Sequence, residues 1–190
     1  MRVKDEQKYD AICDAAIDLI NETGFANASM SKIAKRAGVS PATIYIYFEN
    51  KNALLNKLYL RTKYEMSRRL NTSLDDTLSL EEQFKGLFHN FYLALKNDKR
   101  SFEFIEQFIN SPLINEVSRK EAYRYFKGLD ELFSAGVEQG IIRSCSIELI
   151  HSFSFGVIVD LIKKHHTSRF VMSEKEVAFM IDLIWNTISL

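Results

Sequence analysis

Apolar residues recur with a helical period along most of the chain, and the pattern is most informative between residues 29 and 51. Ser29 is a residue type that caps the start of a helix. It is followed, at spacings of three and four, by one apolar stripe: Met30, Ile33, Ala34 and Ala37. Gly38 can adopt the positive φ that ends a helix. Ser40 and Pro41 then predict the cap and first turn of a second short helix.

This second helix has polar positions on the side away from its expected core residues, Ile44 and Phe48. Thr43, Tyr45 and Tyr47 can point outward. A short capped helix after a tight glycine turn is built like a recognition helix that enters the major groove of DNA. The alternative from the pattern alone is an ordinary helical hairpin.

The rest of the chain also predicts helices, because strand signals are nearly absent and only two prolines and seven glycines occur. A first helix is expected from about residue 5 to 23, ending at Gly24. A polar segment, residues 71–79, reads as a linker. Ser79 with Glu82, and Ser173 with Glu176, form capping boxes that begin two further helices. The other expected helices cover about residues 51–70, 102–109, 115–138 and 147–165, which makes an all-α fold of about nine helices.

The run AKRAGVSPATIYIYFENKNALL resembles the signature of TetR-family transcriptional regulators. Two departures occur: Ile46 stands where many members carry His, and Pro41-Ala42 stand where Lys-Gly is common. The positions that agree in order and spacing are Ile33, Ala34, Gly38, Val39, Ser40, Thr43, Tyr45, Tyr47, Phe48, Lys51, Leu54 and Leu55.

The resemblance implies an N-terminal helix-turn-helix DNA-binding domain over residues 1–50, a connecting helix over 51–70, and a ligand-binding and dimerisation domain over 71–190. It implies a homodimeric repressor that binds a palindromic DNA operator and a small, largely apolar inducer, with the last two helices of each subunit forming a four-helix bundle. An activator, or a regulator without a ligand, stays open. The alternative of another class is a helical ligand carrier or an α-helical enzyme that does not bind DNA.

The candidate DNA-binding residues lie on and around the two short helices. Tyr45 is expected either to pack against the first helix, which is the favoured role, or to contact DNA. Tyr47 and Lys51 are the better candidates for phosphate contact. The full set is Ser29, Ser31, Arg36, Ser40, Pro41, Ala42, Thr43, Tyr45, Tyr47 and Lys51.

Two further sets of candidates lie in the remaining two thirds of the chain. Twelve of the 14 phenylalanines follow residue 80. Most are expected to fill a core, and a ligand cavity is the alternative for Phe84, Phe88, Phe91, Phe104 and Phe108. The last two helices have more apolar surface than one partner covers, which predicts a dimer interface of Ile150, Ser154, Val157, Leu161, Val177, Ile181, Ile184 and Ile188.

Charge and composition add modest constraints. The net charge is zero, but residues 1–70 hold 12 Lys and Arg against 8 Asp and Glu, so the N-terminal part is basic. Cys13 and Cys145 have no metal or redox spacing, and adjacent His165 and His166 point in different directions on a helix. No phosphate loop or nucleophile motif occurs. We therefore expect no enzyme activity, cofactor or metal, and a cytoplasmic location.

Overall fold

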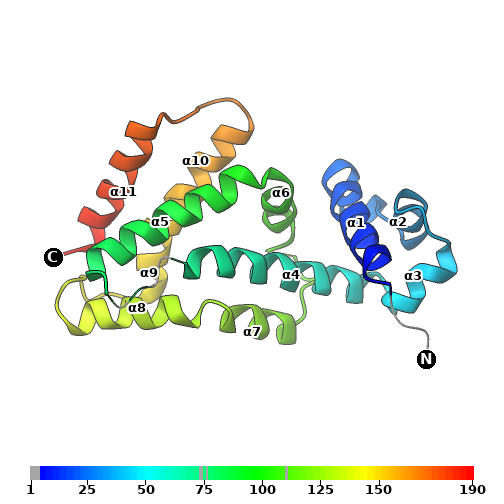
Figure 1. The fold of residues 1–190 in the computed structure, drawn as a ribbon, viewed down its shortest axis with the longest axis horizontal. Helices are drawn as coiled ribbons and strands as arrows, with labels where there is room; N and C mark the ends of the chain where they lie inside the picture. The colour runs from blue at the N-terminus through cyan, green and yellow to red at the C-terminus, as the bar shows by residue number, and fades with distance from the viewer. Residues whose placement is uncertain (1–4, 73–74, 76, 110) are drawn as a thin grey trace. The chain divides into compact units, whose positions relative to one another are not determined.

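The computed structural model describes residues 5–72, 75, 77–109 and 111–190 (Figure 1). These residues form helices and no β-strand, and their one isolated bridge joins Ile142 to Ser189. The all-α prediction is therefore confirmed. The elements are α1 Glu6–Asn27, α2 Met30–Arg36, α3 Pro41–Tyr47, α4 Lys51–Asn71, α5 Leu80–Asn97, α6 Lys99–Phe108, α7 Glu116–Arg124, α8 Lys127–Glu138, α9 Ile147–His151, the π-helix η1 Ser152–Gly156, α10 Val157–His166 and α11 Glu174–Ile188.

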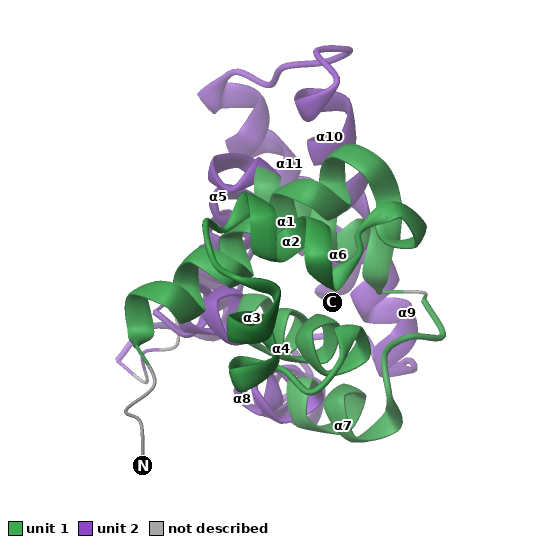
Figure 2. Cartoon of the chain, turned by 90° about the vertical axis from the view of Figure 1, so that its right-hand side faces the viewer, with its two compact units in different colours: residues 1–63, 100–122 green, residues 64–99, 123–190 purple. Residues whose placement is uncertain are grey.

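The chain divides into two compact units (Figure 2). Unit 1 contains residues 5–63 and 100–122, and unit 2 contains residues 64–99 and 123–190. This grouping places α6 and most of α7 with the N-terminal helices. The functional boundaries expected at residues 50 and 70 stay a prediction. Of the expected linker, Asn71 belongs to α4, and residues 73–74 and 76 lie outside the described residues.

Polar contacts explain why residues 100–122 group with the N-terminal helices. The Arg100 guanidinium donates to Asp18 at 2.5 Å and to Asp14 at 3.2 Å, both on α1. The buried Asn56 of α4 donates to the Leu113 carbonyl at 3.0 Å and accepts from the Asn115 amide at 3.0 Å. A side-chain amide paired in both directions satisfies buried polar groups that would otherwise destabilise the fold.

Several predicted helix ends are confirmed. Gly24 has φ +76 and interrupts the helical backbone of α1. The two capping boxes are present: the Ser79 and Ser173 hydroxyls accept from backbone amides of α5 and α11, and the Glu82 and Glu176 carboxylates accept from the amides of the serines. Each box satisfies backbone donors that the first helical turn leaves unpaired.

The predicted single helix over 115–138 is wrong, because α7 and α8 are separate. Phe126, between them, has φ −107 and ψ 9 and makes no side-chain cap. Four residues around the break are weaker helix formers than Ala or Leu: Tyr123, Tyr125, Phe126 and Gly128. The apolar period continues across this break, so the hydrophobic pattern did not reveal it.

The core of unit 2 is a cluster of aromatic rings between α5, α8, η1 and α11. Phe84 is the centre, with its ring centroid 4.7 Å from that of Phe133 and 5.6 Å from that of Trp185. Phe155, from η1, packs edge-on against Phe88 at 5.8 Å and Phe91 at 5.0 Å. Such edge-to-face pairs are favourable beyond their buried area.

Candidate functional site

The helix-turn-helix of α2 and α3 has the local geometry that its sequence predicts. The Ser29 hydroxyl caps α2 by accepting from the Lys32 amide at 3.3 Å. Gly38 follows α2 with φ +68, a conformation that costs glycine little. The Ser40 hydroxyl then caps α3 by accepting from the Thr43 amide at 3.1 Å, and Pro41 occupies the first turn. These caps hold both short helices in place.

The two short helices bury one side and present the other to solvent. Ile33, Ala34 and Ile44 are fully buried. The predicted residues Ser31, Pro41 and Ala42 are exposed, as are the capping residues Ser29 and Ser40. Tyr45 and Ile46 are the exposed large hydrophobic side chains of the two helices, at 55% and 50%. The predicted residues that are accessible to solvent therefore include Ser29, Ser31, Ser40, Pro41, Ala42 and Tyr45. Thr43 is part-buried.

The two tyrosines of α3 have opposite surroundings, and the packing role considered for Tyr45 is wrong. Tyr47 contacts α1 instead. Its ring lies 6.3 Å from that of Tyr9, and its hydroxyl accepts from the Asp5 amide at 3.1 Å and donates to the Asp5 carbonyl at 3.2 Å. Tyr45 is the tyrosine whose ring and hydroxyl face solvent.

Two predicted cations are engaged within unit 1. Arg36 forms a bidentate ion pair with Glu22 of α1, with nitrogen–oxygen distances of 2.5 and 2.6 Å. That hydrogen bond lowers the pKa of the Glu22 carboxyl. Lys51 donates to the Phe25 carbonyl, and partial burial lowers the pKa of its ammonium group. Both side chains hold α1 against its neighbours in the free protein.

Three residues outside the predicted set are also exposed on α2 and α3. Lys35, in the last turn of α2, is exposed. Lys32 is exposed and donates to the Asn27 carbonyl at 3.1 Å. Ile46, which departs from the family pattern, is half-exposed on α3. It lies two positions from the buried Ile44, which on a helix is the opposite side, so the helical period was enough to indicate its exposure.

The five candidate ligand residues separate into two groups. Phe104 and Phe108 belong to unit 1, where Phe108 packs against Phe25 at 5.2 Å and Tyr59 at 5.9 Å. Phe84, Phe88 and Phe91 belong to the aromatic cluster of unit 2. All five are buried. Their role in ligand binding stays a prediction, and each group is packed with its own neighbouring rings.

One histidine lies at the edge of the aromatic cluster in unit 2. The His151 ring packs edge-on against Phe133 at 5.3 Å and Phe155 at 5.5 Å. Burial lowers the pKa of the His151 imidazole, and Asp130, with its carboxylate 3.7 Å from Nε2, opposes this effect. The imidazole is therefore biased toward its neutral form.

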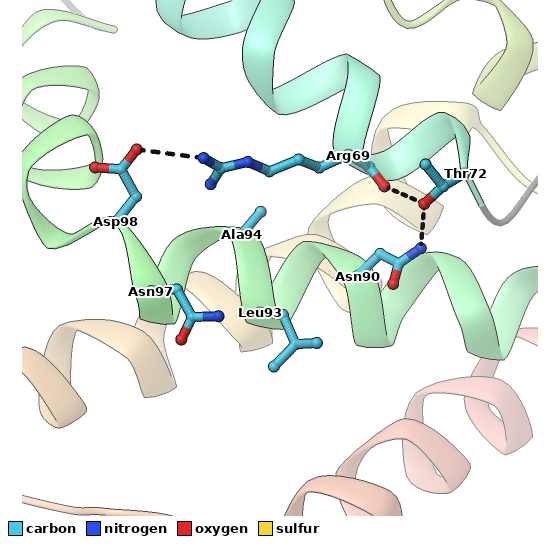
Figure 3. Close-up of a pocket in the computed structure, with 7 residues that line it drawn as sticks. All are labelled: Arg69, Thr72, Asn90, Leu93, Ala94, Asn97 and Asp98. Atoms are coloured by element: carbon cyan, nitrogen blue, oxygen red, sulfur yellow. Dashed lines mark hydrogen bonds and ion pairs between the residues drawn. The ribbon is translucent and has the colours of Figure 1, made fainter.

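A polar pocket of about 550 Å³ opens in unit 2 between the end of α4 and α5 (Figure 3). Arg69 lies across it, 3.9 Å from the Asp98 carboxylate, and Asn90 donates to the Thr72 hydroxyl at 3.1 Å. Leu93, Ala94 and Asn97 complete the lining. None of the five phenylalanines lines this pocket, and its polar character does not suit a largely apolar ligand.

Most of the residues predicted for a dimer interface pack inside their own chain. Val157 is exposed and Leu161 is part-exposed, whereas the buried ones are Ile150, Ser154, Val177, Ile181, Ile184 and Ile188. The surface left open is different. We define the outer apolar face as Leu149, Phe153 and Val157 along α9, η1 and α10, with Phe179 and Leu183 on α11; each is 41–63% exposed. These residues are spaced by four, so each helix presents one stripe.

Among the described residues, no group of three or more His, Cys, Asp or Glu is placed to hold a metal ion. No helix in the described part of the chain has the length and apolar character needed to span a membrane.

The chain is similar to known proteins over both its N-terminal and its C-terminal parts. Residues 12–58 match the model for bacterial regulatory proteins of the tetR family, and residues 79–189 match that for a tetracyclin repressor-like C-terminal domain. The HTH-type transcriptional regulator YdeS of Bacillus subtilis is 30% identical over 97% of this chain and 90% of its own length. The fatty acid metabolism regulator protein of the same species is 28% identical, over 80% of this chain and 79% of its own.

A solved structure has the same fold. The TetR family transcription regulator from Marinobacter aquaeolei superimposes with a TM-score of 0.92 at 24% identity, covering 100% of this chain and 99% of that one. Since two family models match the chain, one of them over more than half its length, the chain belongs to the TetR family and is a DNA-binding transcriptional regulator.

Proposed function

We propose that this regulator is a homodimeric, ligand-responsive repressor that binds a palindromic operator. The observation that carries the proposal is the outer apolar face. Five large apolar side chains are 41–63% exposed on α9, η1, α10 and α11, and α11 packs against η1. Exposed apolar side chains gathered on neighbouring helices are typical of a protein interface. A second copy of the same face covers it in a two-fold dimer, since the same residues then meet on both subunits.

The size of the DNA-reading element supports dimerisation independently. α3 has seven residues, and one such helix contacts few base pairs. Two copies related by a two-fold axis read two half-sites about 34–36 Å apart, which gives the operator its palindromic form. Repression, rather than activation, is favoured by the likeness of residues 79–189 to tetracyclin repressor-like domains.

The ligand that we propose is small and largely apolar, and it binds among the phenylalanines Phe84, Phe88 and Phe91 of unit 2. Phe84 packs against Phe88, and both Phe88 and Phe91 pack against Phe155, so a ligand must separate packed rings. A ligand changes operator affinity only if it binds one conformation of the regulator better than the other. Because one relative is named a fatty acid metabolism regulator, a fatty-acyl compound is the first ligand to test.

The experiment is a titration of a fluorescein-labelled duplex that the full-length protein has selected from random sequences. We expect two chains per duplex, and an affinity that falls with salt by a slope of about 0.9 per phosphate contacted. Palmitoyl-CoA should weaken binding, and a scrambled duplex should bind weakly throughout. One chain per duplex contradicts the dimeric assembly. Unchanged binding with a series of acyl chains contradicts the proposed ligand.

A further inference from the structure

The outward surface of α3 is unusual for a DNA-reading helix because it carries no charged or amide side chain. The helix reads PATIYIY, and the structure describes all seven residues. Ile44 is buried, and Tyr47 packs on α1 with its hydroxyl on the Asp5 backbone. The side chains that remain exposed are Pro41, Ala42, Tyr45 and Ile46.

The hydroxyl groups near this surface are mostly engaged. The Thr43 hydroxyl is 2.8 Å from that of Ser40, and the Ser40 hydroxyl also accepts from the Thr43 amide. Thr43 is itself part-buried. Tyr45 therefore has the one free hydroxyl on α3, and the side chains beside it, Ala42 and Ile46, are purely apolar.

Base edges in the major groove differ in what they offer to such a surface. Guanine is read by the paired donors of Arg or Lys, and adenine by the side-chain amide of Asn or Gln. Thymine alone among the four bases presents a methyl group, which apolar side chains contact. The exposed cations nearby, Lys32 and Lys35, belong to α2 and suit phosphates, which fix position without selecting sequence.

We propose that α3 reads thymine methyl groups through Ile46 and Ala42, so that each operator half-site has thymines at the positions these side chains reach. The inference rests on the proposed function, in which α3 enters the major groove. It adds the base identity and the residues that select it. Ile46 is the principal contact, because half of its large apolar side chain is exposed in the free protein.

The test uses the selected operator duplex and replaces each thymine in turn by deoxyuridine, which lacks only the methyl group. At the contacted positions we expect binding to weaken roughly fourfold, the factor for one methyl group no longer buried. The Ile46→Ala variant should bind the thymine operator more weakly and lose the discrimination at one position of each half-site. Ile46→Gln should shift the selected base there from thymine toward adenine.

Lys35→Ala is the matched control, since it should weaken the thymine and deoxyuridine duplexes by the same factor. Circular dichroism checks that each variant is folded, which is expected because both side chains are exposed. Equal affinity for all deoxyuridine duplexes overturns the inference while leaving operator binding intact. So does an Ile46→Ala variant that keeps the full discrimination. Failure of the wild-type chain to select any sequence would instead refute the proposed function itself.

Discussion

Individual polar residues in unit 1 serve two different purposes, although they belong to the same chemical types. Arg36, Lys51 and Tyr47 attach the helices of the unit to one another, whereas Lys35 and Tyr45 face solvent. A side chain that is already hydrogen-bonded in the free protein must exchange that bond to contact DNA. We therefore expect the solvent-facing residues to contribute more to operator affinity, and the engaged ones more to stability.

The two tyrosines of α3 provide a matched pair for this distinction. Tyr47→Phe removes a hydroxyl with two hydrogen bonds to Asp5, so the free energy of unfolding should fall by about 1 kcal/mol. The folded variant should bind the operator almost as wild type does. Tyr45→Phe should leave urea denaturation unchanged and weaken operator binding. The reverse outcome would mean that the exposed surface of α3 is not the one that reads DNA.

At the scale of helices, local polar signals proved more informative than apolar periodicity. The serine and glutamate of each capping box, and the positive φ at Gly24 and Gly38, could be predicted from residue type, because a helix end needs specific hydrogen bonds or backbone freedom. The break at Phe126 and the π-helix η1 could not. The repeat of apolar residues continues across both segments, so it predicts an uninterrupted helix at each of them.

The capping box of α11 gives a prediction at this scale. Ser173→Ala should lower the free energy of unfolding by about 1 kcal/mol, measured by urea denaturation. Hydrogen bonds from the Ser173 amide and hydroxyl lower the pKa of Glu176 below its ordinary 4.5. The contribution of this carboxylate to the free energy of unfolding is therefore complete above pH 4.5. It is lost as the pH falls through the lower pKa that Glu176 has in the folded protein.

The stability difference between wild type and Glu176→Gln should accordingly shrink as the pH is lowered below 4.5. Glu174→Gln is the control, because Glu174 lies in the same first turn but makes no capping bond. An equal effect of the two substitutions at neutral pH would show that helix-dipole charge, and not the cap, is what matters.

At the scale of the whole molecule, the sequence predicted an interface on the last helices, and the structure places most of the residues predicted for it in the core of their own chain. A helix with apolar residues on two faces is compatible with either face being internal. Ile181 and Ile184 face the chain's own core, whereas Phe179 and Leu183, which share the other side of α11, face solvent. Which face is internal is decided by packing against α5 and η1, and this requires the folded structure.

The dimer is the feature on which operator recognition depends in this account, and sedimentation equilibrium at micromolar concentration tests it most directly. Wild type should be a dimer, and the double variant Phe153→Glu with Leu183→Glu should be a folded monomer that loses tight operator binding. The control Val117→Glu places the same charge on an exposed apolar residue of α7, outside the outer apolar face, and should remain dimeric. A monomeric wild type, or a double variant that stays dimeric with full operator affinity, would contradict the account.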